Sequence, residues 1–291
     1  MTVPSDDTFA LQWQDKVLLL GKRTRVMGVL NVTPDSFSDG GRYLEYDAAV
    51  EHGLRMAGEG ADILDIGGES TRPYADDVSE QEELDRVIPV IRSLSKEIRI
   101  PISIDTVKAR VAREALQAGA SMINDVSALA FDPAMATLAA ETGVPVILMH
   151  MKGIPRTMQE NPVYEDVVSE VMEFLKSAEE RAVRAGVNRD LIILDPGIGF
   201  GKTFDHNLTI IRELRRFSVL KRPLLLGPSR KAFLGRILGN PALDRDNGTM
   251  ATIAVAVLNG AHIVRVHNVR SAVETVKVAD AIRRGGVEEK E

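Results

Sequence analysis

Polar and charged side chains follow several short apolar segments of this sequence, each at the point where the apolar segment ends. In chain order they are Asn31, Glu69, Thr71, Arg72, Asp105, Asn124, Asp125, His150, Asp195, Ser229, Arg230, Lys231, Arg265 and His267. Carboxylates, an amide and a lysine brought together would exchange hydrogen bonds with the edge of a polar ring. The set therefore predicts a binding face for a flat heterocycle, although a single such aspartate is better explained as a helix cap.

Arg265 and His267 lie two residues apart in the last apolar segment, so in a strand they share one face. An inward-facing Arg265 needs an anionic partner, because burying an unpaired guanidinium costs several kcal/mol. The sequence leaves two partners open. One is Asp65, in an earlier apolar segment, and the other is an anionic ligand.

Several familiar sites are excluded by residue type or spacing. The segment DPGIGFGKT lacks the first glycine of a phosphate-binding P-loop, because Pro196 occupies that position. Its glycines instead predict sharp turns or a close approach of the backbone to a ligand. The five histidines form no pair at helical ligand spacing, and without cysteine a zinc site is unsupported. Gly-X-Ser-X-Gly is also absent, which argues against a hydrolase built on Ser229.

The elements that must position these residues are short apolar segments alternating with longer amphipathic ones. We expect eight strands, over residues 26–30, 62–68, 102–105, 122–127, 145–150, 191–197, 223–229 and 262–267. The stretches between them show helical spacing of apolar residues, and five carry a glycine suited to stop a helix. These glycines are Gly60, Gly119, Gly143, Gly186 and Gly260.

Strands separated by helices predict parallel pairing, and eight such units predict an α/β fold of the closed (β/α)₈ TIM-barrel type. In such a barrel, ligands bind at the carboxyl ends of the strands. An open doubly wound sheet is the alternative, although its GxGxxG fingerprint is absent. We expect one domain over residues 1–291, with an N-terminal hairpin segment over 1–23, the barrel over 24–284 and a frayed tail over 285–291.

Composition restricts the partners and the location. The 291 residues are 44% hydrophobic and 27% charged, which is typical of a globular protein, and the formal charge of −6 argues against nucleic acid as a partner. The lack of cysteine and of a secretory signal predicts a reducing compartment, and we expect the cytoplasm. No segment approaches the roughly 20 apolar residues that a membrane span needs, so no membrane partner is expected.

Eight motifs in order resemble the dihydropteroate synthase family. They are NVTPDSFSDGG, GGESTRP, SIDT, NDVS, MHMKGIPRTMQ, LDPGIGFGK, GPSRK and RVHNV. The resemblance implies a transferase of folate biosynthesis that joins 6-hydroxymethyl-7,8-dihydropterin pyrophosphate to 4-aminobenzoate by a dissociative, SN1-like displacement. The products would be 7,8-dihydropteroate and pyrophosphate.

The resemblance also implies roles for individual residues. Asp105, Asn124, Asp195, Lys231 and Arg265 would bind the pterin, and Asp105, Lys231, Arg265 and His267 would be catalytic. Asn31, Thr71, Arg72, Arg265 and His267 would bind pyrophosphate, with the cofactor Mg²⁺ at Asn31. Phe37, Thr71, Pro73, Phe200 and Ser229 would bind 4-aminobenzoate, and sulfonamide inhibitors would enter the same pocket.

A homodimer is expected from the family alone. One departure is Tyr74, which stands where the family usually has glycine after STRP. Two alternative functions stay open. One is a methyltetrahydrofolate-dependent corrinoid methyltransferase, which would keep the pterin-binding residues but would not need Arg72, Arg265 or His267. The other is a non-catalytic pterin-binding paralogue.

Overall fold

A parallel sheet of eight strands forms the centre of the protein in the computed structural model, which describes residues 8–33, 41–70, 77–239 and 245–286. The strand order is β8-β7-β6-β5-β4-β3-β10-β9. The bounds are β3 (Arg25–Asn31), β4 (Ile63–Gly67), β5 (Ile102–Asp105), β6 (Met122–Asp125), β7 (Val146–Met149), β8 (Ile192–Asp195), β9 (Leu225–Leu226) and β10 (Ile263–Val266). A parallel bridge between Leu194 and Leu224 brings the two ends of this order together, so the sheet forms a nearly closed barrel. The predicted barrel is confirmed, and the open sheet is wrong.

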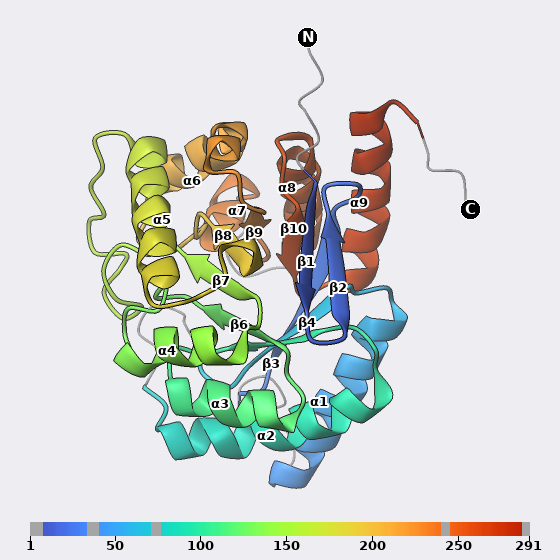
Figure 1. Ribbon diagram of the computed structural model, residues 1–291. Coiled ribbons are helices and arrows are strands. Elements are labelled where there is room, and N and C mark those ends of the chain that lie inside the picture. Colours follow the sequence, from blue (N-terminus) through green and yellow to red (C-terminus); the bar gives the residue numbers. More distant parts are fainter. Residues whose placement is uncertain (1–7, 34–40, 71–76, 240–244, 287–291) are drawn as a thin grey trace.

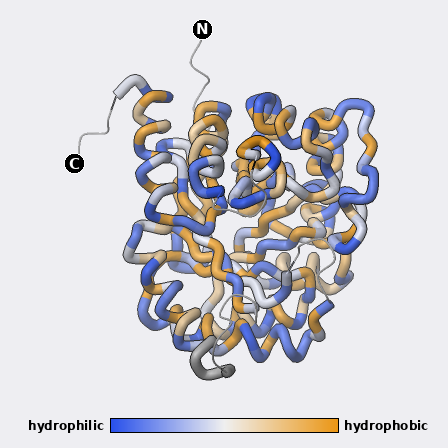
Figure 2. The backbone as a smooth tube through the Cα atoms, turned by 180° about the vertical axis from the view of Figure 1, so that it is seen from behind, coloured by the Kyte–Doolittle hydropathy of each residue, from blue (hydrophilic) through white to orange (hydrophobic). Residues whose placement is uncertain are grey.

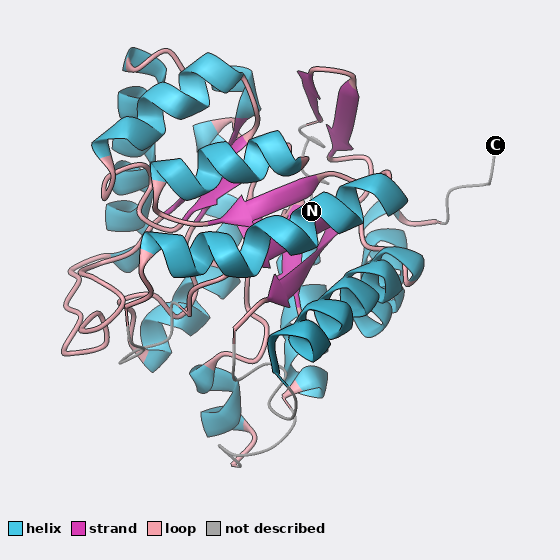
Figure 3. Cartoon of the chain, turned by 90° about the horizontal axis from the view of Figure 1, so that it is seen from below, coloured by secondary structure: helices cyan, strands magenta, loops and turns pink. Residues whose placement is uncertain are grey.

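Helices surround the strands, as Figures 1 and 3 show. Their bounds are α1 (Gly41–Gly58), α2 (Glu80–Glu97), α3 (Ala109–Ala118), α4 (Pro133–Thr142), α5 (Val167–Arg184), α6 (Phe204–Arg212), α7 (Ala232–Ile237), α8 (Asp246–Leu258) and α9 (Val269–Arg284), with 3₁₀ turns η2 (Arg189–Leu191) and η3 (Leu214–Leu220). The five glycines expected to stop helices all have left-handed φ angles, between 60° and 117°. None of the described helices is long and apolar enough to cross a membrane.

The strands are mostly apolar because both of their faces are covered. β4, β6, β7 and β8 are buried at every position, one face in the barrel interior and the other under helices. Figure 2 shows hydrophobic and hydrophilic residues alternating along the outer helices, as expected for elements with one buried side.

The seventh barrel strand is shorter than predicted. The expected residues 223–229 yield only β9, Leu225–Leu226. Pro223 and Pro228 bracket it, and neither has the N–H that a strand ladder needs. The polar residues after it therefore lie on a loop.

The N-terminal hairpin is present as β1 (Phe9–Trp13) paired antiparallel with β2 (Lys16–Leu20). Leu11 and Leu20 belong to the main core. The Phe9 ring packs edge-on against His262, which immediately precedes β10, and β1 also contacts η2, which leads into β8. The hairpin therefore covers the amino-terminal end of the barrel and leaves the carboxyl end free for the site.

Candidate active site

Strand register brings polar residues to one rim, the carboxyl end of the barrel. Asn31 at the end of β3 is opposite Gly67 of β4, Gly67 is opposite Asp105 of β5, and Asp105 is opposite Asn124 of β6. On the far side of β6 and β7, Asp195 ends β8 opposite Met149. Residues separated by more than 160 positions in the chain thus lie on the same level of the barrel.

Four side chains of the barrel strands form one hydrogen-bonded network, which we call the acid–arginine network. They are Asp65, Asp105, Asn124 and Arg265. Arg265 donates from Nε to Asp65 Oδ2 at 2.6 Å and from Nη2 to Asp105 Oδ2 at 2.7 Å. Asn124 donates from Nδ2 to the same Asp65 oxygen at 2.9 Å. The buried arginine therefore has protein carboxylates as partners, the first of the two possibilities that the sequence left open. Asp105 makes this ion pair and is not a helix cap, since the residue preceding α3 is Lys108.

Burial and charge act in opposite directions on this network. Burial raises the pKa of Asp105 to about 7, although the Arg265 guanidinium opposes the shift. Burial alone would lower the pKa of Arg265, but the Asp65 and Asp105 carboxylates outweigh it and hold that pKa above its usual range. The arginine is therefore permanently charged, whereas Asp105 titrates near neutral pH.

Asp195 and Lys231 lie within electrostatic reach of the network. Asp195 Oδ1 accepts from the backbone N–H of Gly197 at 2.7 Å, and Oδ2 has no hydrogen-bond partner among the described residues. Burial raises the Asp195 pKa to about 6, although the Gly197 hydrogen bond and the charges of Lys202, Lys231 and Arg265 oppose that shift. The predicted pterin-binding residues thus share one rim.

Lys231 stands over the ring of Phe200, with Nζ 4.1 Å from the ring centroid. A side-chain carbon added at Gly199 would come within 2.9 Å of Lys231 Cδ, so glycine there leaves room for the lysine stem. The loop after β8 therefore sets where this cation lies.

Ser229 and His267 form a second pair at the rim. Ser229 Oγ lies 2.9 Å from His267 Nδ1 and accepts from the His267 backbone N–H at 3.2 Å. With its oxygen accepting from the backbone, the hydroxyl can donate to Nδ1, which places the ring proton on Nε2. The predicted pyrophosphate ligand His267 and the predicted aminobenzoate ligand Ser229 are thus neighbours.

Four other residues of the sequence-derived polar set have protein partners. Asp125 binds Ser127, Glu69 binds Lys108, Arg230 binds Asp246 and His150 binds Lys202. The first three shape turns and loops, which the sequence pattern alone could not separate from ligand binding. Five residues singled out in the sequence, Phe37, Thr71, Arg72, Pro73 and Tyr74, lie outside the described residues.

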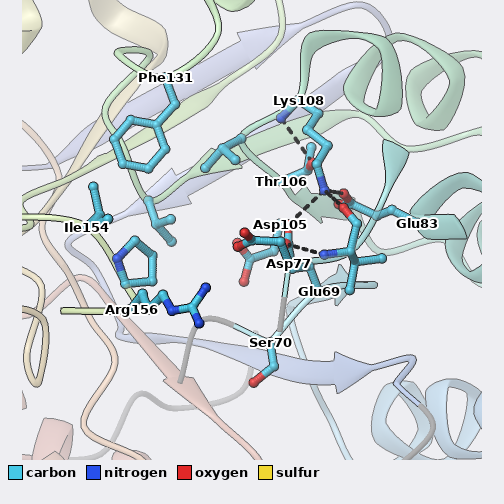
Figure 4. A pocket seen from close by; sticks show the side chains of 14 residues that line it. Glu69, Ser70, Asp77, Glu83, Asp105, Thr106, Lys108, Phe131, Ile154 and Arg156 are labelled. Atoms are coloured by element: carbon cyan, nitrogen blue, oxygen red, sulfur yellow. Dashed lines mark hydrogen bonds and ion pairs between the residues drawn. The ribbon is translucent and has the colours of Figure 1, made fainter. Parts of the chain in front are cut away.

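A cavity of about 340 Å³ adjoins the rim beside β5 and β6 (Figure 4). Asp105 lines it, with an apolar wall that includes Val126, Phe131 and Ile154 and with Arg156 at one side. Among its lining residues, Lys108 forms ion pairs with Glu69 at 2.8 Å and with the buried Glu83 at 2.6 Å. The sequence pattern singled out Glu69 but missed Lys108 and Glu83, because the three residues lie on different parts of the fold without a common spacing.

Asn31 is the residue with the donor chemistry for Mg²⁺. It is half-buried at the end of β3, and its side-chain amide bonds to none of the described residues, so its oxygen is available. No group of three or more His, Cys, Asp or Glu side chains suited to a metal occurs in the described part of the chain. One oxygen ligand fits an ion that keeps its waters and binds substrate phosphates.

Comparison with known proteins gives concordant results. The family model for pterin binding enzymes matches residues 27–267. The chain is 51% identical to a dihydropteroate synthase of Synechocystis sp. over 91% of this chain and 92% of the relative. It is 44% identical to the Yersinia pestis dihydropteroate synthase solved with a sulfonamide drug, with a TM-score of 0.89 over 95% of this chain and 100% of that one. A Xanthomonas albilineans dihydropteroate synthase solved with 4-aminobenzoic acid is also 44% identical, with a TM-score of 0.87 over 95% and 98% of the two chains.

Proposed function

The chain belongs to the dihydropteroate synthase family of pterin-binding enzymes, and on this premise we propose how its residues divide the reaction. The enzyme is a transferase that joins 6-hydroxymethyl-7,8-dihydropterin pyrophosphate to 4-aminobenzoate and yields 7,8-dihydropteroate and pyrophosphate. The similarity to synthases over nearly the whole chain favours this function over the corrinoid methyltransferase and over a non-catalytic paralogue.

The pterin ring binds among Asp105, Asn124, Asp195 and Lys231. The observation that carries this proposal is the convergence of these side chains, from three strands and from the loop after β9, on one rim around Arg265. Asp195 Oδ2 has no hydrogen-bond partner among the described residues and can accept from the amino group and ring N–H of a pterin. Lys231 donates to the ring carbonyl oxygen.

Arg265 stabilises the charge that separates when the C–O bond ionises. Its Nε and Nη2 are held by Asp65 and Asp105, while Nη1 makes no hydrogen bond within the described residues. The guanidinium face packs on the pterin, and Nη1 donates to the departing pyrophosphate. His267 assists from Nε2, and Asn31, Thr71 and Arg72 complete the anion site. The step is dissociative, since the electron-rich dihydropterin can carry the positive charge of the methylene group.

Mg²⁺ is the proposed cofactor, with the Asn31 amide oxygen as its protein ligand. When bound, it neutralises negative charge on the pyrophosphate. Asn31 orients the diphosphate towards the strand ends, and Gly67, which is opposite both Asn31 and Asp105, places no side chain between them.

The arylamine binds beside the pterin, against Phe200 and Ser229 and with Phe37, Thr71 and Pro73. The contact between Phe200 and Lys231 supports this placement, because it sets an aromatic wall next to the ring-binding lysine. Relatives have been solved with 4-aminobenzoic acid and with a sulfonamide drug, which supports both compounds as ligands of this enzyme.

We further propose a homodimer built on the outer faces of α8 and α9. Both helices expose large apolar side chains: Val255, Leu258, Val278 and Ile282. Dimer formation would remove these side chains from water. Analytical ultracentrifugation tests whether the protein is a dimer in solution. Location in the cytoplasm stays a prediction.

The test of function is direct. Purified protein is incubated with Mg²⁺, the pterin pyrophosphate and 4-aminobenzoate, and pyrophosphate and dihydropteroate are measured. Equal amounts of both, formed only when both substrates are present, support the proposal. Binding of pterin without turnover would identify the paralogue, and methyl transfer from methyltetrahydrofolate to a corrinoid would identify the methyltransferase.

A further inference from the structure

Lys202 is a buried cation that the proposed chemistry does not use. The residue is 2% exposed, and its Nζ contacts three acceptors: His150 Nδ1 at 2.8 Å, the Phe200 carbonyl at 3.0 Å and the His150 carbonyl at 3.4 Å. It forms no ion pair with the described carboxylates. Burial lowers the pKa of Lys202 to about 7, although the charge of Asp195 opposes the shift. Holding an ammonium here, with hydrogen bonds to neutral acceptors only, is costly, so its position calls for a function that offsets the cost.

His150 complements this cation as a neutral ring. Burial, followed by the charge of Lys202, lowers the His150 pKa to about 2. Nδ1 therefore accepts from the lysine, and the ring proton lies on Nε2. The imidazole is also fixed by an edge-on contact with Phe174, at 4.8 Å between ring centroids. The His150 ring is thus held in place by Phe174 as well as by Lys202.

Lys202 ties the loop of residues 197–201, which follows β8, to the segment that follows β7. The two segments are packed so tightly that an added Cβ at Gly197 would lie 1.9 Å from the His150 carbonyl oxygen, and one at Gly201 would lie 2.3 Å from that of Lys152. Both glycines also have positive φ, 71° and 61°. The Tyr164 hydroxyl donates to the Gly201 carbonyl at 2.7 Å and adds a further tie.

This loop carries the groups proposed to receive the arylamine. Phe200 lies under Lys231, and Gly199 contacts the Lys231 stem. Lys202 donates to the Phe200 carbonyl and so helps to fix the backbone that carries that ring. By contrast, the acid–arginine network shares no hydrogen bond with Lys202 in the described residues. Asp195 is affected by the charge of Lys202 but forms no hydrogen bond with it.

We propose that Lys202 is a positioning residue which, through His150, fixes the 197–201 loop so that Phe200 forms the wall of the arylamine pocket. The inference rests on the proposed function. It predicts that loss of the lysine weakens use of 4-aminobenzoate far more than binding of the pterin. A role in general stability would affect both substrates alike.

The experiment compares Lys202→Met with Lys176→Met, a matched change at an exposed position of α5. Steady-state kinetics is measured with each substrate varied in turn. For Lys202→Met we expect KM for 4-aminobenzoate to rise roughly tenfold and KM for the pterin pyrophosphate to change less than about twofold. Lys202→Gln keeps a donor for one carbonyl, so its KM for 4-aminobenzoate should lie between those of Lys202→Met and wild type. Both KM values of the control, Lys176→Met, should equal those of wild type.

Unchanged KM for 4-aminobenzoate in Lys202→Met, or an equal rise in both KM values, would overturn the proposal. If Lys202→Met does not fold, Lys202→Gln decides by the same comparison. The test is separate from that of the function itself, because a wild-type protein that releases no pyrophosphate fails before any variant is compared.

Discussion

A single oxygen of Asp65, Oδ2, accepts hydrogen bonds from both Arg265 Nε and Asn124 Nδ2, at 2.6 and 2.9 Å. Asp65 is fully buried, and its other oxygen, Oδ1, has no partner among the described residues. One carboxylate without access to solvent therefore sets the position of two residues that we place against the pterin. Leaving Oδ1 without a hydrogen bond is costly, which is typical of functional sites rather than of optimised cores.

Replacing Asp65 by asparagine should lower kcat/KM by about tenfold or more, equivalent to about 1.4 kcal/mol. The amide keeps the size of the side chain and an oxygen that can accept from Asn124, but it removes the charge that fixes Arg265. Asp47→Asn, at an exposed position of α1, is the matched control. Wild-type kinetics for Asp65→Asn, with Arg265 unmoved in its crystal structure, would contradict this role.

Arg265→Ala should lose more than tenfold in kcat, at least about 1.4 kcal/mol in the barrier. The guanidinium is proposed to act on developing charge, so kcat should fall more than the affinity for 4-aminobenzoate. Rapid-quench measurement of pyrophosphate formation isolates the chemical step. Arg270→Ala, an exposed position on α9, serves as the control. Normal turnover in Arg265→Ala would remove the residue from the mechanism.

Pterin affinity should depend on pH through Asp195. Because the Asp195 pKa is raised to about 6, the residue is a carboxylate above that pH and a neutral acid below it. Only the carboxylate accepts hydrogen bonds with both oxygens, so affinity should fall as pH drops below about 6. Calorimetric titration with the pterin pyrophosphate between pH 5 and 8 would measure this, using roughly half-unit steps around the stated pKa.

Asp195→Asn should bind pterin weakly at every pH while keeping wild-type circular dichroism. The step near pH 6 should disappear, and any remaining change near pH 7 should reflect Asp105, whose pKa is raised to about 7. Full affinity in this variant would return Asp195 to a purely structural role in the turn with Gly197.

Gly197→Ala should destabilise the protein by several kcal/mol, on the order of 3. Its φ of 71° disfavours any side chain, and the added carbon would lie 1.9 Å from the backbone oxygen of His150. Gly58→Ala is the contrast, because the space around that position is empty and alanine favours a helix by about 1 kcal/mol. Equal thermal unfolding midpoints for the two variants would contradict the tight packing of the 197–201 loop.

Alternation of apolar and amphipathic segments was enough to predict the barrel and the end of it that carries the polar residues. Each strand there is a short, continuous apolar run that ends in a polar residue, as in β8 and Asp195, and such runs are typical of a sheet covered on both faces. Strand length was less predictable near proline: β9 is two residues long because Pro223 and Pro228 cannot donate to a neighbouring strand.

Parts of the site could be predicted where the type and position of one residue were informative. Contacts between residues far apart in the chain were less predictable. Arg265, as a cation in an apolar strand, demanded an anion, and the sequence identified Asp65 as one candidate. Asp65 on β4 contacts side chains of β10 and β6, which are not adjacent to β4 in the sheet, so both contacts depend on the closure of the barrel. The contact of Lys202 with His150 depends on the pairing of β7 with β8. Nothing in their spacing reveals such contacts, because β7 and β8 are separated by all of α5.

The most direct measurement of the central claim is a crystal structure of the protein with the pterin pyrophosphate bound. The pterin ring should lie at the barrel rim within hydrogen-bonding distance of Asn124, Asp195 and Lys231, with the Arg265 guanidinium against its face and the diphosphate towards Asn31 and His267. A pterin found elsewhere, for instance enclosed in the cavity beside Phe131 and Ile154 without contact to those residues, would contradict the account.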